Sequence, residues 1–181
     1  MAVPSTLYHR TANQQADNFS FMKPAKPEWH NEDRIEEAFR AWLTSHGWQV
    51  QYRTGQSGAD ISAVDQHNVR WLFEVKGYPA TYKKLGGETK SESSKRTQRR
   101  IWFIEALGQS LTRITDPDFR IGIIFPDHPT DAYFQKAALS LPQFLRDKLD
   151  LWVFLVGQES FVRVLSPDSL RFEDAIHTKL S

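Results

Sequence analysis

The chain has 181 residues, of which 40% are hydrophobic and 13% aromatic, so it can bury the core of one soluble α/β domain. It contains no cysteine, which excludes disulfides, thiolate catalysis and zinc–cysteine sites, and its six scattered histidines argue against a histidine-rich metal site. A net charge of only +1 excludes a bulk polycation, so any affinity for nucleic acid must come from a localised surface.

The first 30 residues differ from the rest of the chain. They are polar and carry prolines at positions 4, 24 and 27, with aromatic residues such as Phe19 and Trp29 between and after them. We expect an extended N-terminal arm over residues 1–30, docked on its own or a neighbouring subunit, and a single domain over residues 31–181. Because no apolar run approaches 18 residues and there is no basic-then-apolar leader, we expect a cytoplasmic protein.

The segment after Asn31 has the hydrophobic spacing of an amphipathic helix. Asn31 is a suitable N-cap, and Gly47 is a suitable stop. The acids Glu32 and Asp33 suit the positive end of the helix dipole, so we assign them no chemistry. Glu36 lies at the border of the apolar stripe, where its side chain can reach toward the edge of a sheet. The stripe consists of Ile35, Ala38, Phe39, Trp42 and Leu43.

Two short strands joined by a turn-prone tetrapeptide follow this helix. Residues 59–64 and 71–76 have the composition and alternation of strands, which predicts an antiparallel hairpin. In the second strand Glu74 and Lys76 share one face with Leu72, and Trp71, Phe73 and Val75 share the other. Pairing within the hairpin brings Asp60, at the start of the first strand, close to the end of the second.

Asp60, Glu74 and Lys76 are residue types that a hydrolytic metal site requires. Hard divalent cations prefer oxygen ligands, so the two carboxylates and the backbone carbonyl of Val75 form a suitable partial shell. A bound metal lowers the pKa of coordinated water, while Lys76 can orient that water or stabilise charge on a phosphodiester. The alternative is an ordinary ion pair at a solvated edge, but the apolar neighbours Trp71 and Phe73 favour a central strand.

The stretch from Lys83 to Arg100 concentrates positive charge after this hairpin. It contains seven basic and two acidic residues, a local net charge of +5, and its glycines and serines predict a mobile loop. Contacts with DNA phosphates would make binding strongly salt-dependent, and a solvated charged loop is the alternative. The candidate DNA-binding residues are Lys83, Lys84, Lys90, Lys95, Arg96, Arg99 and Arg100.

The second half of the chain alternates helices with apolar strands, which is typical of parallel strands in a mixed sheet flanked by helices. The predicted elements are a helix over residues 97–114, a strand over 120–126, a helix within 131–150 interrupted at Pro142, strands over 151–157 and 161–165, and a short closing helix after Pro167. The apolar side of the first of these helices is formed by Phe103, Ile104, Leu107, Leu111 and Ile114.

Asp60, Glu74 and Lys76 together resemble the core motif of the PD-(D/E)XK nuclease superfamily, which includes restriction endonucleases and Holliday junction resolvases. Ala59 stands at the proline of the family name, a backbone feature that takes no part in the chemistry. The resemblance covers residues 32–157. It implies a restriction endonuclease-like, three-layer α/β core in the order αβββαβ, with metal-dependent hydrolysis of phosphodiesters as the usual activity.

The resemblance also implies roles for two helical residues. Related nucleases often carry a glutamate on the first helix that helps to hold a metal, and Glu36, with its spacing to Trp48, resembles that of the resolvase branch. The segment 106–111 is similar to a motif whose glutamine approaches the active site, which would be Gln109 here. The alternatives are a solvated helix acid for Glu36 and, since helical projection puts Gln109 on the polar side, no site role for it.

The leading hypothesis is a metal-dependent DNA endonuclease in which Asp60 and Glu74 ligate Mg2+ or Mn2+. Glu36 assists, and Lys76 acts on the attacking water. Since one site cuts one strand, duplex or junction cleavage favours a homodimer or a subunit of a larger defence, repair or mobile-element complex. One alternative is a catalytically silent DNA-binding or scaffold protein with the nuclease fold. Another is an unrelated α/β protein whose acids form surface ion pairs.

Overall fold

A computed structural model describes residues 28–51, 58–81, 88–113, 118–159, 161–169 and 176–179. The predicted arm over residues 1–30 lies almost entirely outside this part of the chain. The described elements are α1 (Glu32–Ser45), β1 (Gln49–Gln51), β2 (Ile61–Val64), β3 (Arg70–Val75), α2 (Glu92–Thr112), β4 (Phe119–Pro126), α3 (Tyr133–Ser140), α4 (Gln143–Leu149), β5 (Leu151–Val156), β6 (Phe161–Leu165) and β7 (Ile176–Lys179). The predicted α/β class is confirmed.

The described strands form one sheet in the order β1-β2-β3-β4-β5-β6-β7. The first three strands pair antiparallel, β3, β4 and β5 pair parallel, and β5, β6 and β7 pair antiparallel again. The parallel strands are joined through helices because a parallel pair needs a long crossover. The mixed sheet and its buried central strands β4 and β5 therefore agree with the apolar runs in the sequence.

Helix α1 begins and ends where the sequence predicts. The side chain of Asn31 accepts a hydrogen bond from the backbone N–H of Arg34 at 2.9 Å, which satisfies one of the free donors of the first turn. The helix ends at Ser45, and Gly47 follows with a φ of 75°, a conformation that glycine adopts without strain. The predicted apolar stripe is confirmed, since α1 buries Ile35, Phe39, Trp42 and Leu43.

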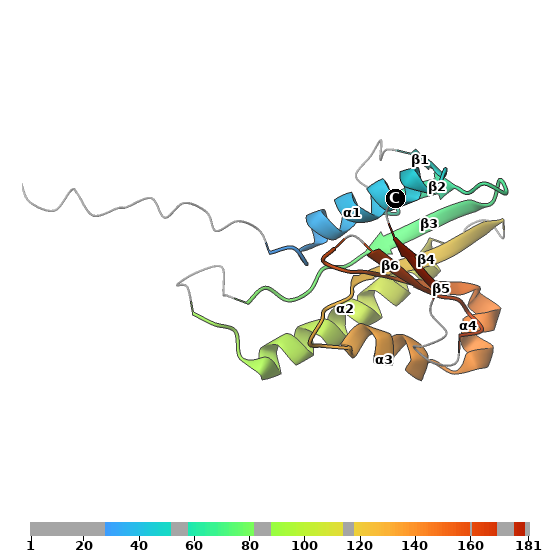
Figure 1. Ribbon diagram of the computed structural model, residues 1–181. Helices are drawn as coiled ribbons and strands as arrows, with labels where there is room; N and C mark the ends of the chain where they lie inside the picture. Colours follow the sequence, from blue (N-terminus) through green and yellow to red (C-terminus); the bar gives the residue numbers. More distant parts are fainter. Residues whose placement is uncertain are drawn as a thin grey trace, which may run out of the picture.

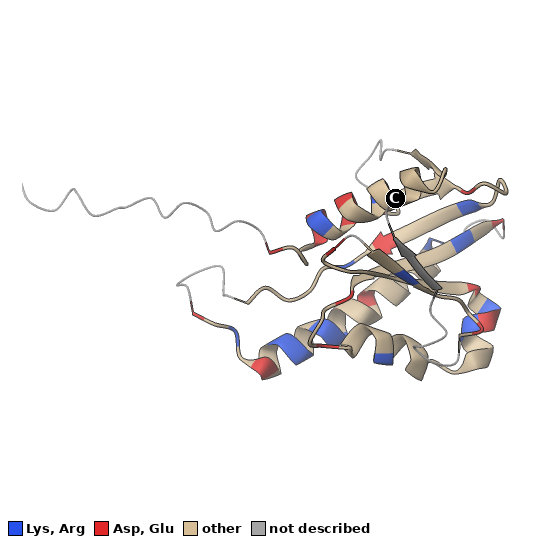
Figure 2. Cartoon of the chain, viewed as in Figure 1, with Lys and Arg blue, Asp and Glu red and all other residues tan. Residues whose placement is uncertain are grey.

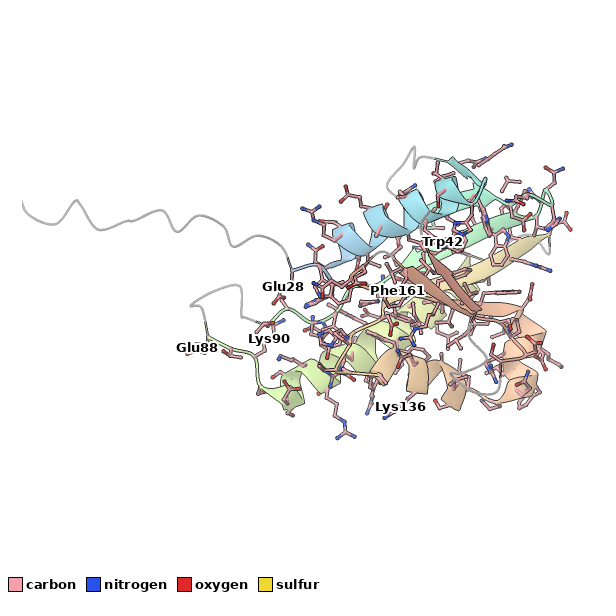
Figure 3. The ribbon with its side chains drawn as sticks, viewed as in Figure 1. Glu28, Trp42, Glu88, Lys90, Lys136 and Phe161 are labelled. Atoms are coloured by element: carbon pink, nitrogen blue, oxygen red, sulfur yellow. The ribbon has the colours of Figure 1, made fainter. Side chains whose placement is uncertain are left out.

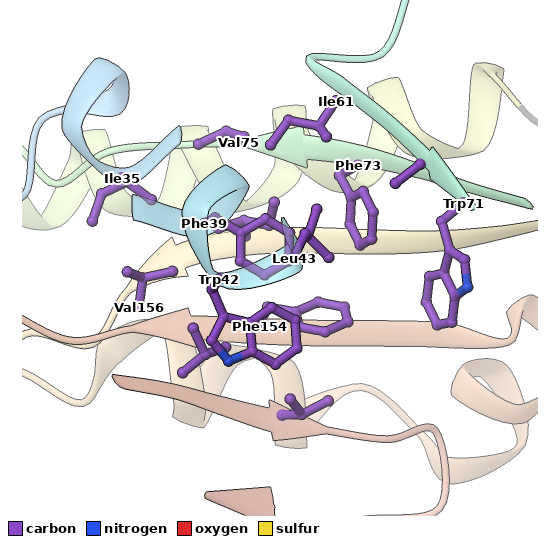
Figure 4. Packing of buried hydrophobic residues seen from close by; sticks show 14 residues of the cluster. Ile35, Phe39, Trp42, Leu43, Ile61, Trp71, Phe73, Val75, Phe154 and Val156 are labelled. Carbon is purple, nitrogen blue, oxygen red and sulfur yellow. The ribbon is translucent and has the colours of Figure 1, made fainter. Parts of the chain in front are cut away.

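Two apolar layers hold the helices against the two faces of the sheet. Helix α1 covers one face, and α2 and α3 lie on the other (Figure 1). On the α1 side, the ring of Phe39 packs edge-to-face on Phe73 and on Phe154, each with centroids 5.1 Å apart (Figure 4). Trp71 and Val75 share this layer with Phe73, as the alternation of β3 predicts.

Helix α2 differs from its prediction in both start and orientation. It begins at Glu92, capped by Ser91, within the segment expected to be a mobile loop. Ile104, predicted to be buried, is 57% exposed, and Leu111 is also exposed. The side of α2 that packs on the sheet combines Phe103, which is buried as predicted, with the small residues Ala106 and Ser110. Its buried residues are Arg99, Phe103, Ala106 and Ser110.

The C-terminal third contains one further difference. The predicted interruption at Pro142 separates α3 from α4, and is confirmed. Where a closing helix was expected after Pro167, the described residues form a turn and then strand β7, paired with β6. None of the helices in the described part of the chain is both long and apolar enough to cross a membrane.

Candidate active site

The turn between β2 and β3 sets the register of the hairpin that builds the site. A carboxylate oxygen of Asp65 accepts the backbone N–H groups of His67 and Val69, at 2.8 and 2.9 Å. Asn68 completes the turn with a φ of 62°. The register that results pairs Ile61 with Phe73.

This register places Asp60 beside the last residues of β3. The N–H of Asp60 donates to the carbonyl of Phe73 at 3.0 Å, and its carboxylate Oδ2 accepts the N–H of Val75 at 2.8 Å. The carbonyl of Asp60 accepts from the guanidinium of Arg40 on α1 at 2.7 Å. The sequence-predicted neighbours Asp60 and Val75 are therefore brought together, and the Asp60 carboxylate is held in one orientation.

Glu74 is the most deeply buried acid of the site, with 2% of its side chain exposed. One carboxylate oxygen accepts from Nζ of Lys76 at 2.6 Å, and the other pairs with the guanidinium of Arg113. Burial raises the pKa of Glu74, and Asp60 raises it further, while Lys76 and Arg113 oppose the shift. A carboxyl in this state gains strongly from a nearby positive charge.

Lys76 extends from the end of β3 beside Glu74. Its side chain is only 12% exposed, and its backbone N–H donates to the carbonyl of Ile124 on β4 at 3.0 Å. The neighbouring strand thus fixes the backbone from which the ammonium projects. Asp60, Glu74 and Lys76 converge at the end of β3, as the hairpin predicts.

The acid of α1 that interacts with this group is Glu32, which was predicted to have no role in the chemistry. Glu32 is exposed to solvent as a whole, but partial burial raises the pKa of its carboxyl. The charge of Lys76 opposes this shift, and the charges of Asp60 and Glu74 add to it. Its carboxylate also accepts the N–H of Gly77. The absence of a side chain at Gly77 allows the approach, because a Cβ there would lie 2.7 Å from the backbone nitrogen of Glu32.

Glu36, the predicted helix acid, is connected to Asp60 through one intervening residue, Arg40. Its carboxylate pairs with Arg40 at 2.8 Å, and Arg40 in turn donates to the backbone carbonyl of Asp60. The described contacts therefore connect Glu36 to the Asp60 backbone through Arg40. The first turn of α1 is nearer to the acids because it packs on Gly77, a tertiary contact that helical periodicity does not reveal.

Arg113, and not the predicted Gln109, is the residue near the end of α2 that contacts Glu74 in the described part of the chain. Gln109 is exposed, and its carbonyl accepts the hydroxyl of Thr112 at 2.9 Å. Arg113, which caps α2, is the residue that reaches Glu74. The sequence did not single out Arg113, and its only signal was a cation at the end of a helix predicted to cross the sheet.

The predicted DNA-binding residues have different environments. Lys83 and Lys84 lie outside the described residues. Lys90 donates to Gln98 at 3.1 Å, and Lys95 pairs with Glu92 at 2.9 Å. Arg99 is buried and pairs with Asp131. Arg96 and Arg100 are exposed. Figure 2 shows Lys and Arg gathered on the first half of α2, with a red arrowhead at the end of β3.

The donor set at the end of β3 fits a hard divalent cation in its chemistry. Asp60 and Glu74 offer carboxylate oxygens and Val75 a carbonyl, and burial, followed by the nearby Asp60, raises the pKa of Glu74. Within the described ranges, however, no group of three or more histidine, cysteine, aspartate or glutamate side chains has the arrangement of a metal cluster. Two acids and one carbonyl therefore form an incomplete shell that water and substrate oxygens would complete.

Comparisons of the chain with protein-family models, with curated proteins and with solved structures gave no match.

Proposed function

We propose that the protein is a metal-dependent DNA endonuclease of the PD-(D/E)XK type. One observation carries the proposal: the Asp60 carboxylate is hydrogen-bonded to the backbone of Val75, directly between Glu74 and Lys76 at the buried end of a central strand. Two carboxylates and a lysine, the residue types that a hydrolytic metal site requires, therefore lie close together. Ion pairs on a solvated edge would not require the burial of Glu74.

The order of elements supports the same proposal. From Glu32 to Pro126 the chain forms a helix, three antiparallel strands, a second helix and a strand parallel to the third. The resemblance to the superfamily implies the order αβββαβ, so this arrangement supports the proposal. The remaining elements extend the sheet beyond β4.

In the proposed mechanism, Asp60, Glu74 and the carbonyl of Val75 would hold Mg2+ or Mn2+. The bound cation would lower the pKa of a water molecule and offset charge on the phosphodiester. Water adds to phosphorus, one ester P–O bond breaks, and the leaving oxygen takes a proton, giving a phosphate monoester and a hydroxyl. Lys76, kept close by Glu74, orients the water or stabilises the developing negative charge.

Residues from the two helices assist this chemistry. Glu32 adds a third carboxylate whose charge is felt by Asp60, Glu74 and Lys76, which favours a cation at the site. Arg113 neutralises Glu74 and has the planar donor geometry that suits a phosphate oxygen. Glu36 fixes Arg40, and Arg40 fixes the backbone of Asp60. We propose that Glu36 acts through this chain, in addition to any metal contact through water.

A second candidate is a nuclease-fold DNA-binding or scaffold protein that does not cut. The observation in its favour is that both oxygens of Glu74 already have cationic partners, Lys76 and Arg113, as in a structural ion-pair network. Such a network neutralises the acid without a metal. Under this alternative the protein binds DNA equally well with Mg2+ and with EDTA.

The two candidates are separated by incubating the protein with linear, nicked, branched and single-stranded DNA in Mg2+, Mn2+ or EDTA. The nuclease proposal predicts cleavage that EDTA abolishes and that Lys76→Met slows by about a hundredfold or more. The matched variant Lys148→Met removes an exposed lysine from α4 and should cut like the wild type. Binding without cleavage on every substrate would favour the scaffold.

A further inference from the structure

A polar cavity lies beside the end of β3 and is distinct from the group formed by Asp60, Glu74 and Lys76. It has a volume of about 540 Å3 and is lined from four segments: the turn before α1, the residues after Lys76, the first turns of α2 and the loop between β4 and α3. We call it the His30–His128 cavity after two of its lining residues. The segments are tied together by the N–H of Tyr78, which donates to the carbonyl of His30 at 2.8 Å.

Two buried side-chain nitrogens of residues that line this cavity lack hydrogen-bond partners in the described part of the chain. His30 is 7% exposed and Arg99 is 8% exposed, and both line the cavity. Among the described residues, neither Nδ1 of His30 nor Nε of Arg99 has a hydrogen-bond partner. A buried polar group without a partner is costly, and Nε of an arginine can only donate. The cavity is therefore suited to a ligand that presents acceptor oxygens.

The other donors of the cavity have the same preference. Lys95 is largely buried, and Thr81 and Thr130 add hydroxyl groups. Burial, together with Asp131, raises the pKa of Tyr78 to about 12, so its phenol stays protonated. His128 stacks on Tyr78 with centroids 4.3 Å apart, which presents its ring beside that of His30.

The acids around the cavity are already engaged. Asp131 accepts from Arg99 and Tyr78, and Glu92 pairs with Lys95. Glu28 and Lys90, both labelled in Figure 3, contact the backbone of Thr81: Glu28 accepts its N–H at 3.0 Å, and the N–H of Lys90 donates to its carbonyl at 2.8 Å. The acids around the cavity therefore have cationic or hydrogen-bonded partners, whereas Nδ1 of His30 and Nε of Arg99 have none among the described residues.

We propose that the His30–His128 cavity binds a phosphate group, with His30, Lys95 and Arg99 as its principal donors. Its position supports a role next to the acidic group, because Tyr78 is two residues from Lys76 and Gly77 packs against the chain between His30 and Glu32. Binding of phosphate rests on the cavity alone. That this phosphate belongs to a DNA strand whose neighbouring bond is cut rests on the proposed function.

Protonation of His128 should accompany binding. Burial lowers the pKa of His128. The nearby charges that lower this pKa further belong to His30, Arg99 and Lys95, and the charge of Asp131 opposes them. Tyr78 and Thr130 also face His128 and contribute no charge. A bound dianion favours the imidazolium, so the pKa of His128 should rise and the affinity should increase as the pH falls. Sulfate, which does not titrate in this range, gives the same test without protonation of the ligand.

The experiment follows the imidazole NMR signals of the wild-type chain while inorganic phosphate or sulfate is added at constant ionic strength. The proposal predicts saturable shifts of His30 and His128 and an upward shift of the His128 titration, with His67 unchanged as the exposed reference. Equal small shifts at all three histidines, or none, would overturn it. Because no substitution is involved, a folding defect cannot obscure the result.

A matched pair of variants then tests the donors. Lys95→Gln should weaken phosphate binding at least severalfold, whereas Lys148→Gln removes an exposed positive charge from α4 and should not. Equal weakening by the two would indicate general charge attraction and contradict the proposal.

Oligonucleotides identify the source of the phosphate. Displacement of inorganic phosphate by a 5′-phosphorylated strand and not by its 5′-hydroxyl form supports binding of a terminal phosphate; displacement by both supports a backbone phosphate. Phosphate binding that neither strand displaces supports a free phosphate as ligand. Asp60→Asn should lose cleavage but keep phosphate binding. If the wild-type protein binds phosphate saturably but cuts no DNA, the proposed function alone is contradicted; if it cuts DNA but does not bind phosphate, this inference alone is contradicted.

Discussion

Glu74 experiences two opposing effects in one buried position. Burial penalises its ionised form, while Lys76 and Arg113 stabilise that form through direct hydrogen bonds. The resulting pKa lies above the usual value of a glutamate. For a carboxyl whose pKa is raised by folding, the stabilising contribution is complete below the unfolded pKa and is lost as the pH rises through the folded pKa.

The loss of stability that ionisation of Glu74 causes at higher pH predicts how Mg2+ should affect the unfolding temperature. A cation held by ionised Asp60 and Glu74 should offset the loss, so Mg2+ should raise the unfolding temperature more at pH 8 than at pH 5. At a concentration of one hundred times the Kd the stabilisation would be about 2.7 kcal/mol. Thermal unfolding in Mg2+ or EDTA across this range measures it. A Mg2+ effect that is constant, or larger at pH 5, would contradict this account of Glu74.

The residues of the site were predictable to different degrees. The proximity of Asp60, Glu74 and Lys76 follows from the two-residue period of strands and from hairpin register, which are local rules. Arg113 and Glu32 reach the group from helix ends, whose positions depend on how α1 and α2 pack on the sheet. Glu32 was attributed to the helix dipole because that explanation is sufficient for an isolated helix.

At the scale of elements, Gly77 sets the distance between α1 and β3. Gly77→Ala should push the first turn of α1 away from the sheet, because the added Cβ would lie 2.7 Å from the backbone nitrogen of Glu32. We expect a loss of about 1–3 kcal/mol in the free energy of unfolding, as for overpacking in a tight contact. Urea denaturation monitored by tryptophan fluorescence measures this loss.

Gly108→Ala is the matched control for this substitution. Gly108 lies on the exposed side of α2, and a Cβ there meets nothing within 4 Å. Alanine is the better helix former, so this variant should gain about 0.5–1 kcal/mol. If both variants lost stability equally, the contact between Gly77 and Glu32 would not be the cause.

The elements themselves were largely predictable, with one instructive exception. Strong alternation in β3 and uniform apolar runs in β4 and β5 indicate their positions in the sheet, and the cap at Asn31 indicates the start of α1. On α2 Phe103 is buried as predicted, but the rest of the sheet-facing side uses Ala106 and Ser110, whereas Ile104 is exposed to solvent. Helical periodicity ranks residues by hydrophobicity, but close packing on a sheet also selects small ones.

At the scale of the whole molecule, a near-neutral chain concentrates cations on one helix. Arg99 and Lys95 are committed to the His30–His128 cavity, so the exposed Arg96 and Arg100 are the α2 residues best placed to contact DNA phosphates. Replacing both by glutamine should reduce the slope of log K against log salt concentration by roughly 2, since each lost phosphate contact removes about 0.9. Fluorescence anisotropy with labelled DNA measures the slope.

The control double variant replaces Lys136 and Lys148, exposed lysines of α3 and α4, by glutamine. It removes the same total charge from other helices. An equal reduction of the salt slope in the two double variants would show that net charge, and not the α2 surface, controls DNA binding.

The central claim is that the protein cuts DNA with the help of a cation held by Asp60 and Glu74. The rate of single-turnover cleavage tests this claim most directly. The rate in Mg2+ is measured for the wild type, for Asp60→Asn and for Asp33→Asn, which removes an exposed acid from the same helix as Glu32. The account predicts that Asp60→Asn is slower by about a hundredfold or more, while Asp33→Asn cuts like the wild type. Equal cleavage by Asp60→Asn and the wild type would contradict it.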